Sequence, residues 1–193
     1  MTTWHWIRHG PTHEKNFVGW RDVPADLSDT VTINRLRAAL PKRAVLVASD
    51  LSRASQTATA IDAGHERLPD HHELREFHFG DWDGRHFSEI SQEHPELSRA
   101  YWENPGDVVP PGGESWNMAA ARVGSAVARL TQAHRGRDII AVAHFGVILT
   151  QIQAALGVSA ADVLAHRIEP LSLTRICFEP DGSAQVELIN HQP

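Results

Sequence analysis

The sequence is poor in cysteine, in long apolar runs and in basic residues. Its 193 residues include a single cysteine, Cys177, which excludes a disulfide framework within the chain and a cysteine-rich zinc site and leads us to expect a reducing, cytoplasmic compartment. No apolar run approaches the ~18 residues of a membrane span. Arg8 and His9 also stand where a signal peptide would carry its apolar core. With 18 basic against 24 acidic residues, the net charge is −6, which disfavours nucleic acid and anionic membranes as partners.

Enough apolar material remains for a folded core. Hydrophobic residues make up 41% of the chain, which excludes a disordered protein. There is no internal repeat, low-complexity tract or obvious linker, and the length suits one domain, which we expect to span residues 1–193. Prolines and glycines are concentrated in residues 104–113 (NPGDVVPPGG), which predicts an irregular loop there.

Three continuous apolar runs predict strands that are buried on both faces, as in a parallel sheet. They lie at residues 4–7, 44–48 and 138–143. Helical periodicity occurs between and after them, in residues 33–40, 54–61, 116–130 and 147–156. Alternating runs on either side of Asp181-Gly182 predict a terminal hairpin. The pattern indicates an α/β fold, a three-layer α/β/α sandwich whose mostly parallel sheet carries an antiparallel C-terminal hairpin.

Polar clusters follow each of the three predicted buried strands. They are Arg8-His9-Gly10, Ser49-Asp50-Leu51-Ser52-Arg53 and His144-Phe145-Gly146. Ligands of open α/β sheets bind outside the carboxyl ends of the strands, so these loops should meet at one place. The guanidinium groups of Arg8 and Arg53 match phosphate oxygens, and two helix N-termini add backbone N–H donors. A small phosphorylated molecule is therefore the expected ligand.

Histidine and glutamate at such a site favour a reaction over mere binding. A neutral imidazole of His9 or His144 is a nucleophile near pH 7, and the alcohol that leaves phosphorus needs a proton from a general acid. The best carboxyl candidate is Glu76, in the aromatic-rich segment LREFHFGDWDG, where partial burial would raise its pKa. Glu73 competes with it for this role.

Five segments, in order, resemble the motifs of the histidine phosphatase superfamily, the phosphoglycerate-mutase-like enzymes. They are IRHGPT at residues 7–12, SDLSRASQT at 49–57, LRE…FG.WDG at 74–84, PGGES at 111–115 and AHFG at 143–146. The resemblance implies that His9 is the phosphorylated nucleophile and that Arg8, Arg53 and His144 hold the phosphoryl oxygens. It further implies that Glu76 is the acid and later the base, that Thr12 contacts the phosphate, and that no metal or organic cofactor takes part.

The chain departs from the family pattern at three positions. Pro11 has no N–H to offer a phosphate, Asn16 lies about one residue later than the family's asparagine, and Phe145 replaces a residue that is usually glycine. Asn16 and Phe145 are still the expected substrate contacts. The short chain resembles the small phosphatases, so we expect a metal-independent phosphomonoesterase. A phosphoglycerate-type mutase, and a weakly active phosphate-binding or phosphoprotein-interaction module, stay open as alternatives.

Other interpretations of single residues compete with these roles. Arg53 could pair with Asp50 at the protein surface, where an ion pair is worth little. The adjacent His71 and His72 could suggest a metal site, but no accompanying ligand motif supports one, so we expect them to be solvated. Cys177 is expected to be a buried apolar group.

Overall fold

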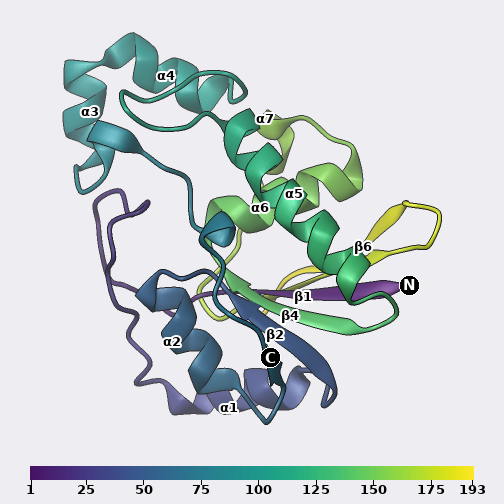
Figure 1. Ribbon diagram of the computed structural model, residues 1–193. Helices are drawn as coiled ribbons and strands as arrows, with labels where there is room; N and C mark the ends of the chain where they lie inside the picture. Colours follow the sequence, from purple (N-terminus) through teal and green to yellow (C-terminus); the bar gives the residue numbers. More distant parts are fainter.

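The computed structural model describes residues 1–193 and is built on one six-stranded sheet with strand order β3-β2-β4-β1-β5-β6 (Figure 1). The strands are β1 (Thr2–Arg8), β2 (Ala44–Ala48), β3 (Glu66–Arg67), β4 (Asp138–Ala143), β5 (Leu173–Phe178) and β6 (Ala184–His191). The first four are parallel, β5 is antiparallel to β1, and β6 is antiparallel to β5. The mostly parallel sheet and its terminal hairpin confirm the prediction.

Helices cover both faces of the sheet (Figure 1). One layer holds α1 (Thr30–Ala39) and α2 (Ser52–Ile61). The other holds α5 (Trp116–Ala133), α6 (Phe145–Leu156) and the short α7 (Ala160–Val163). Each layer encloses its own apolar core, of 14 buried residues on the α1–α2 side and 22 on the α5–α6 side. The predicted three-layer sandwich is therefore confirmed.

The side chains of β1 alternate between the two cores, as the period of a strand requires. Trp4 and Trp6 are fully buried in the larger core with their rings stacked 4.8 Å apart. His5 lies between them in sequence and its imidazole bonds Asp138 at 2.8 Å. The tryptophans thus anchor the strand that ends at Arg8, next to the predicted site.

Local signals place the boundaries of the later elements where the sequence predicts them. Gly157 ends α6 with a φ of 65°, a left-handed conformation that suits glycine. Ser159 and Asp162 form a capping box at the start of α7. The turn between β5 and β6 is closed by a hydrogen bond from the Glu179 N–H to the Ser183 carbonyl. Cys177 is buried on β5, as predicted.

Between β3 and α5 the chain first forms two short 3₁₀ turns (His72–Leu74 and Gly80–Trp82), and Leu74 and Phe77 of this segment belong to the larger core. The next part, α3 (Phe87–Glu93) and α4 (Pro95–Glu103), stands apart from the sheet (Figure 1, teal). A separate small cluster of Trp82, Ile90 and Tyr101 holds this part together. Residues 104–113 form no regular helix or strand, as predicted. None of the helices has the length and apolar character to cross a membrane.

Candidate active site

The two candidate histidines follow neighbouring parallel strands. His9 comes directly after β1 and His144 directly after β4, and their ring centroids lie 5.1 Å apart. Arg53 is in the first turn of α2, which begins just after β2, the other neighbour of β4. His9, Arg53 and His144 are only 7%, 1% and 0% exposed. The carboxyl ends of the three strands therefore bring these groups to one buried place, as expected.

The backbone orients the His9 ring. Its Nδ1 lies 2.6 Å from the carbonyl oxygen of Gly10; since a carbonyl only accepts, Nδ1 carries the proton and Nε2 keeps its lone pair. The Gly10 N–H in turn donates to the Thr57 hydroxyl at 3.0 Å. The tight turn needs glycine at position 10, because an added Cβ would lie 2.7 Å from Leu27. Thr57 is a positioning residue that sequence reasoning did not single out, although it closes the second motif.

Both histidines are held neutral near pH 7. Burial, reinforced by the Arg53 and Arg8 charges, lowers the pKa of His9 from 6.5 to about 3. Burial and the charge of Arg53 likewise hold the pKa of His144 well below its usual value. A neutral His9 can offer its Nε2 lone pair to an electrophile, so the electrostatics suit a nucleophile.

The two arginines are fixed by main-chain carbonyls. Arg8 donates to the Ile168 carbonyl at 2.6 Å, and its guanidinium lies 5.6 Å from the Phe145 ring centroid. Arg53 donates to the carbonyls of Gly19 and Arg21 at 2.7 and 3.0 Å. The alternative that Arg53 pairs with Asp50 is therefore wrong.

Asp50 instead accepts two hydrogen bonds from Arg75, both at 2.7 Å. That bidentate pair satisfies the carboxylate and leaves Arg53 without an acidic partner among the ion pairs of the structure. The positive charge of Arg53 is thus available to an anion at the site.

Several buried nitrogen atoms of this group have no hydrogen-bond partner. Both ring nitrogens of His144, the Nε of Arg8 and the Nε of Arg53 are in this state. Buried polar atoms in folded proteins are nearly always paired, so each such atom calls for an explanation. Unpaired nitrogens on two arginines and a neutral histidine, beside His9, are what a phosphate-binding site would present before its ligand binds.

Glu76 supplies a buried carboxyl to the same site. Its Oε1 accepts from the Phe77 N–H at 3.0 Å and its Oε2 from the Gly146 N–H, at the start of α6, at 3.1 Å. Burial raises the pKa of Glu76, although those hydrogen bonds and the charges of Arg53 and Arg8 act in the opposite direction. The competing Glu73 instead pairs with Arg129 at 2.6 Å. Glu76 is therefore the carboxyl with the environment of a general acid.

Gly146 permits the close approach of that carboxyl. A Cβ at this position would lie 2.6 Å from Oε1 of Glu76 and 3.0 Å from the Phe77 ring. The family pattern singled out Phe145, whereas the position that has no room for a side chain is the next one, Gly146. Only the fold, which brings residues 70 positions apart into contact, shows this.

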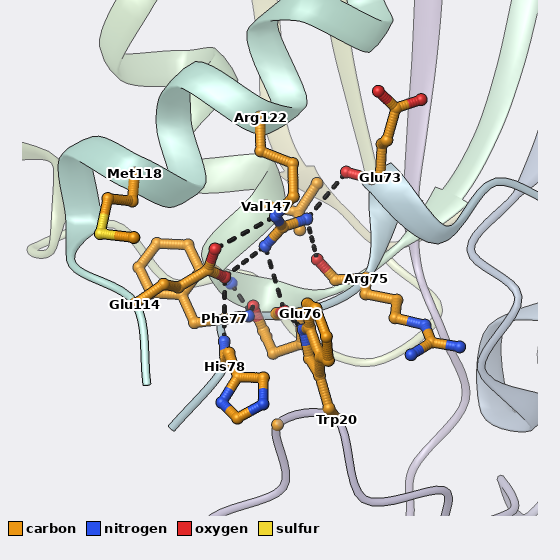
Figure 2. A network of polar contacts seen from close by, with 12 residues as sticks. Trp20, Glu73, Arg75, Glu76, Phe77, His78, Glu114, Met118, Arg122 and Val147 are labelled. Carbon is orange, nitrogen blue, oxygen red and sulfur yellow. Dashed lines mark hydrogen bonds and ion pairs between the residues drawn. The ribbon is translucent and has the colours of Figure 1, made fainter. Parts of the chain in front are cut away.

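Figure 2 shows how Arg122 of α5 clamps the segment that carries Glu76. Its guanidinium donates to the carbonyls of Glu73, Arg75 and Glu76 at 2.8, 3.0 and 3.3 Å, and it forms an ion pair with Glu114. The Glu114 carboxylate also accepts from the His78 N–H at 2.9 Å. One side chain thus fixes the backbone on both sides of the carboxyl.

Sequence reasoning missed Arg122, although a signal was present. The residue lies three positions after Ala119 and four before Ala126, both buried on α5, so an arginine occurs on the inner edge of an apolar helix face. The Trp20 indole N–H donates to the Glu76 carbonyl at 2.8 Å, which makes Trp20 part of the same support.

Replacing Arg122 with methionine should lower kcat roughly 10- to 100-fold, because small displacements of a catalytic group are costly. The pH above which activity falls should shift as well, because the surroundings that raise the pKa of Glu76 would change. Arg122→Lys should restore part of the activity. Removing one partner of a buried ion pair also costs about 3–5 kcal/mol of stability, so thermal unfolding is measured alongside. An unchanged pH profile in a folded variant would remove the positioning role.

The three remaining predicted contacts are less buried than His9, Arg53 and His144. Thr12 is half-buried shortly after β1, and Phe145 is half-buried at the start of α6. Asn16 is exposed, and its amide donates to the Gly84 carbonyl at 2.8 Å. Pro11, which has no N–H, uses its carbonyl to accept from Asp26. The substrate contacts of Thr12, Asn16 and Phe145 stay predictions.

An apolar pocket adjoins Glu76 and Gly146. It has a cavity volume of about 40 Å³, is partly open to solvent, and extends from the site to α4 and the following loop. Its walls include Trp102 of α4. No group of three or more His, Cys, Asp or Glu side chains in the structure is arranged to hold a metal ion.

Comparison with known proteins places the chain in a family. Residues 5–192 match the histidine phosphatase superfamily (branch 1). An adenosylcobalamin/alpha-ribazole phosphatase of Salmonella typhimurium is 30% identical over 95% of this chain and 94% of its own length. The bifunctional protein Rv2228c of Mycobacterium tuberculosis is 31% identical over 91% of this chain, which spans only 46% of that relative.

A solved structure gives the same picture. A mycobacterial glucosyl-3-phosphoglycerate phosphatase, Rv2419c, in complex with inorganic phosphate, superposes with a TM-score of 0.85 at 26% identity and covers 98% of this chain and 97% of its own. Its fold and those sequence matches agree with the motif order read from the sequence. The chain belongs to the histidine phosphatase superfamily.

Proposed function

We propose that the protein hydrolyses a small phosphomonoester through a phosphohistidine on His9. The observation that carries the proposal is the buried cluster of Arg8, Arg53 and His144 around His9, whose unpaired nitrogens suit a phosphoryl group. The first turns of α2 and α6 add backbone N–H groups and the positive ends of two helix dipoles. Phosphatases among the relatives support the same reaction class.

In the first step the Nε2 lone pair of His9 forms a bond to phosphorus while the bond between phosphorus and the alcohol oxygen breaks. The Glu76 carboxyl, whose pKa is raised by burial, gives its proton to the departing oxygen. Arg8, Arg53 and His144 bind the equatorial oxygens, where charge is concentrated in the transition state.

In the second step the Glu76 carboxylate takes a proton from a water molecule. The water oxygen bonds to phosphorus as the bond between phosphorus and Nε2 breaks, which releases phosphate and returns His9 to its neutral form. His9, Glu76 and one water molecule supply every proton and electron pair, so the proposal needs no metal. A small phosphorylated substrate is the only partner that it requires; the cytoplasmic location stays a prediction.

Release of phosphate from para-nitrophenyl phosphate between pH 5 and 8, with a chelator present and in ¹⁸O-labelled water, tests the proposal. We expect chelator-resistant turnover and one labelled oxygen in each released phosphate. Transfer of the phosphoryl group to added phosphoglycerate without phosphate release would instead establish a mutase. Tight binding of inorganic phosphate with no turnover of any ester would establish a binding module.

A further inference from the structure

The apolar pocket beside Glu76 is walled by aromatic rings from four parts of the chain. Phe77 and Phe79 come from the segment after Glu76, Tyr101 and Trp102 from α4, Trp116 from the start of α5, and Phe145 from the start of α6. The pocket also touches Glu76 and Gly146, so it continues directly from the reacting centre. It therefore lies where the alcohol part of a phosphate ester would extend from the phosphorus.

These rings support one another in fixed geometries. Phe77 and Trp116 meet edge to face at 5.2 Å and 79°, and Tyr101 and Trp102 meet at 5.1 Å and 90°. Such contacts favour a particular orientation of each ring, so the walls are formed before a ligand enters. Rigid aromatic walls favour a flat apolar group over a flexible or rounded one.

Two polar atoms in the wall lack partners. The Tyr101 hydroxyl and the Trp102 indole N–H are buried with no hydrogen-bond partner, and Tyr101 is only 6% exposed. By contrast, the indole N–H of Trp116 donates to Gln153 at 2.6 Å. Burial raises the pKa of Tyr101, which keeps its hydroxyl a donor. An acceptor atom on a ligand that reached either group would satisfy a donor that the fold leaves unused.

The pocket offers nothing to an anionic alcohol. Glu76 is the only charged residue among those that line it, and no lysine or arginine does so. A carboxylate or a second phosphate on the alcohol would face aromatic carbon and a carboxyl group, and its desolvation would go uncompensated. This argues against phosphoglycerates as substrates.

We propose that the substrate is a phosphomonoester of an uncharged alcohol that carries a flat aromatic group with an acceptor atom. The aromatic group lies in the pocket between α4, α5 and α6. Its acceptor atom accepts a hydrogen bond from the Tyr101 hydroxyl or the Trp102 N–H. This inference rests on the proposed function, because it assumes that the phosphate occupies the site at His9.

A set of matched esters tests the inference. The leaving alcohols of ethyl, 2-cyclohexylethyl and 2-phenylethyl phosphate are all primary alkanols, so their reactivity at phosphorus is similar. We expect kcat/KM for 2-phenylethyl phosphate to exceed that for ethyl phosphate by about 10- to 100-fold, since a buried phenyl group gains that much. The cyclohexyl ester should fall between them. The proposal would be overturned if kcat/KM were equal for the phenylethyl and ethyl esters, or for the phenylethyl and cyclohexylethyl esters. A higher kcat/KM for 3-phosphoglycerate than for the phenylethyl ester would overturn it too.

Variants locate the effect in the pocket. Trp102→Leu should reduce the phenylethyl-to-ethyl ratio several-fold. Tyr101→Phe should reduce the ratio of 2-(4-pyridyl)ethyl to 2-phenylethyl phosphate, because it removes a donor and keeps the ring. Phe87→Ala is the matched control: this α3 aromatic is 50% exposed and does not line the pocket, so both ratios should stay unchanged. If Trp102→Leu behaves like this control, the pocket does not bind the alcohol.

Failure of the reaction and failure of the pocket can be told apart. If no ester is hydrolysed, the proposed function is wrong. Calorimetric measurement of the binding of 2-phenylethyl and ethyl phosphate then tests the pocket separately from the reaction. Tighter binding of the phenyl ester supports the aromatic site, and equal binding overturns it. If every ester is hydrolysed at one rate, the phosphatase stands and the inference falls.

Discussion

Replacing His9 with alanine should abolish phosphate release, with a loss of about 10⁴-fold or more in kcat, as is found when a catalytic nucleophile is removed. The buried ring, its Nδ1–H bound to the Gly10 carbonyl, aims only Nε2 at a substrate. No neighbouring group duplicates this, because neither ring nitrogen of His144 has a hydrogen-bond partner in the protein that would fix its tautomer and aim the other nitrogen.

A direct measurement of the intermediate accompanies this variant. Rapid quenching at alkaline pH followed by mass spectrometry should find a phosphoryl group on the peptide that contains residue 9, and the group should be lost in acid. His134→Ala is the control, since His134 follows α5 at the opposite end of the sheet from the site. Undiminished turnover in folded His9→Ala, or label on another residue, would contradict the mechanism.

Glu76→Gln should give the second large effect, about 10²- to 10⁴-fold in kcat, the range found when a general acid is removed. The loss should be greatest for alkyl esters, whose alkoxides need a proton, and smaller for para-nitrophenyl phosphate, whose phenolate leaves unaided. Glu73→Gln is the control, because Glu73 is a neighbouring carboxylate engaged with Arg129. Equal losses in kcat/KM, which reports the first step alone, for good and poor leaving groups would exclude proton donation by Glu76.

The raised pKa of Glu76 also determines how activity and stability depend on pH. Burial raises the pKa of Glu76 above its ordinary value of 4.5, so the acid form persists at higher pH and activity is lost as pH rises through the raised pKa. The folded state also binds this proton more tightly than the unfolded state. The free energy of unfolding therefore decreases as pH rises from 4.5 to the raised pKa. Glu76→Gln should remove both the alkaline limb and this part of the stability change.

The sheet could be predicted from the sequence because its central strands are continuous apolar runs, and such runs are unambiguous when they alternate with periodic helices. The site followed from the same feature, since residues placed directly after parallel strands must converge. The two-residue strand β3 and the short helices α3 and α4 were missed. Elements of this length carry too few apolar positions to show a period.

Support for the site depends on contacts between residues far apart in the sequence. Arg122 binds carbonyl oxygens of Glu73 and Arg75, and the Gly146 N–H meets Glu76 across 70 residues. Main-chain acceptors have no residue type, so no pattern of letters identifies them as partners. Proximity in sequence made an Arg53–Asp50 ion pair plausible. In the fold Arg53 binds main-chain carbonyls instead, and Asp50 pairs with Arg75.

The α3–α4 part of the chain is held by its own small cluster of Trp82, Ile90 and Tyr101, separate from the two cores that stabilise the sheet. This separation has an evolutionary consequence. Substitutions in α4 and the loop after it can reshape the wall that faces the alcohol while the strands that carry the reacting groups keep their packing. Substrate preference can therefore diverge between relatives through changes in one region, while the strands that position His9 and His144 are conserved in structure.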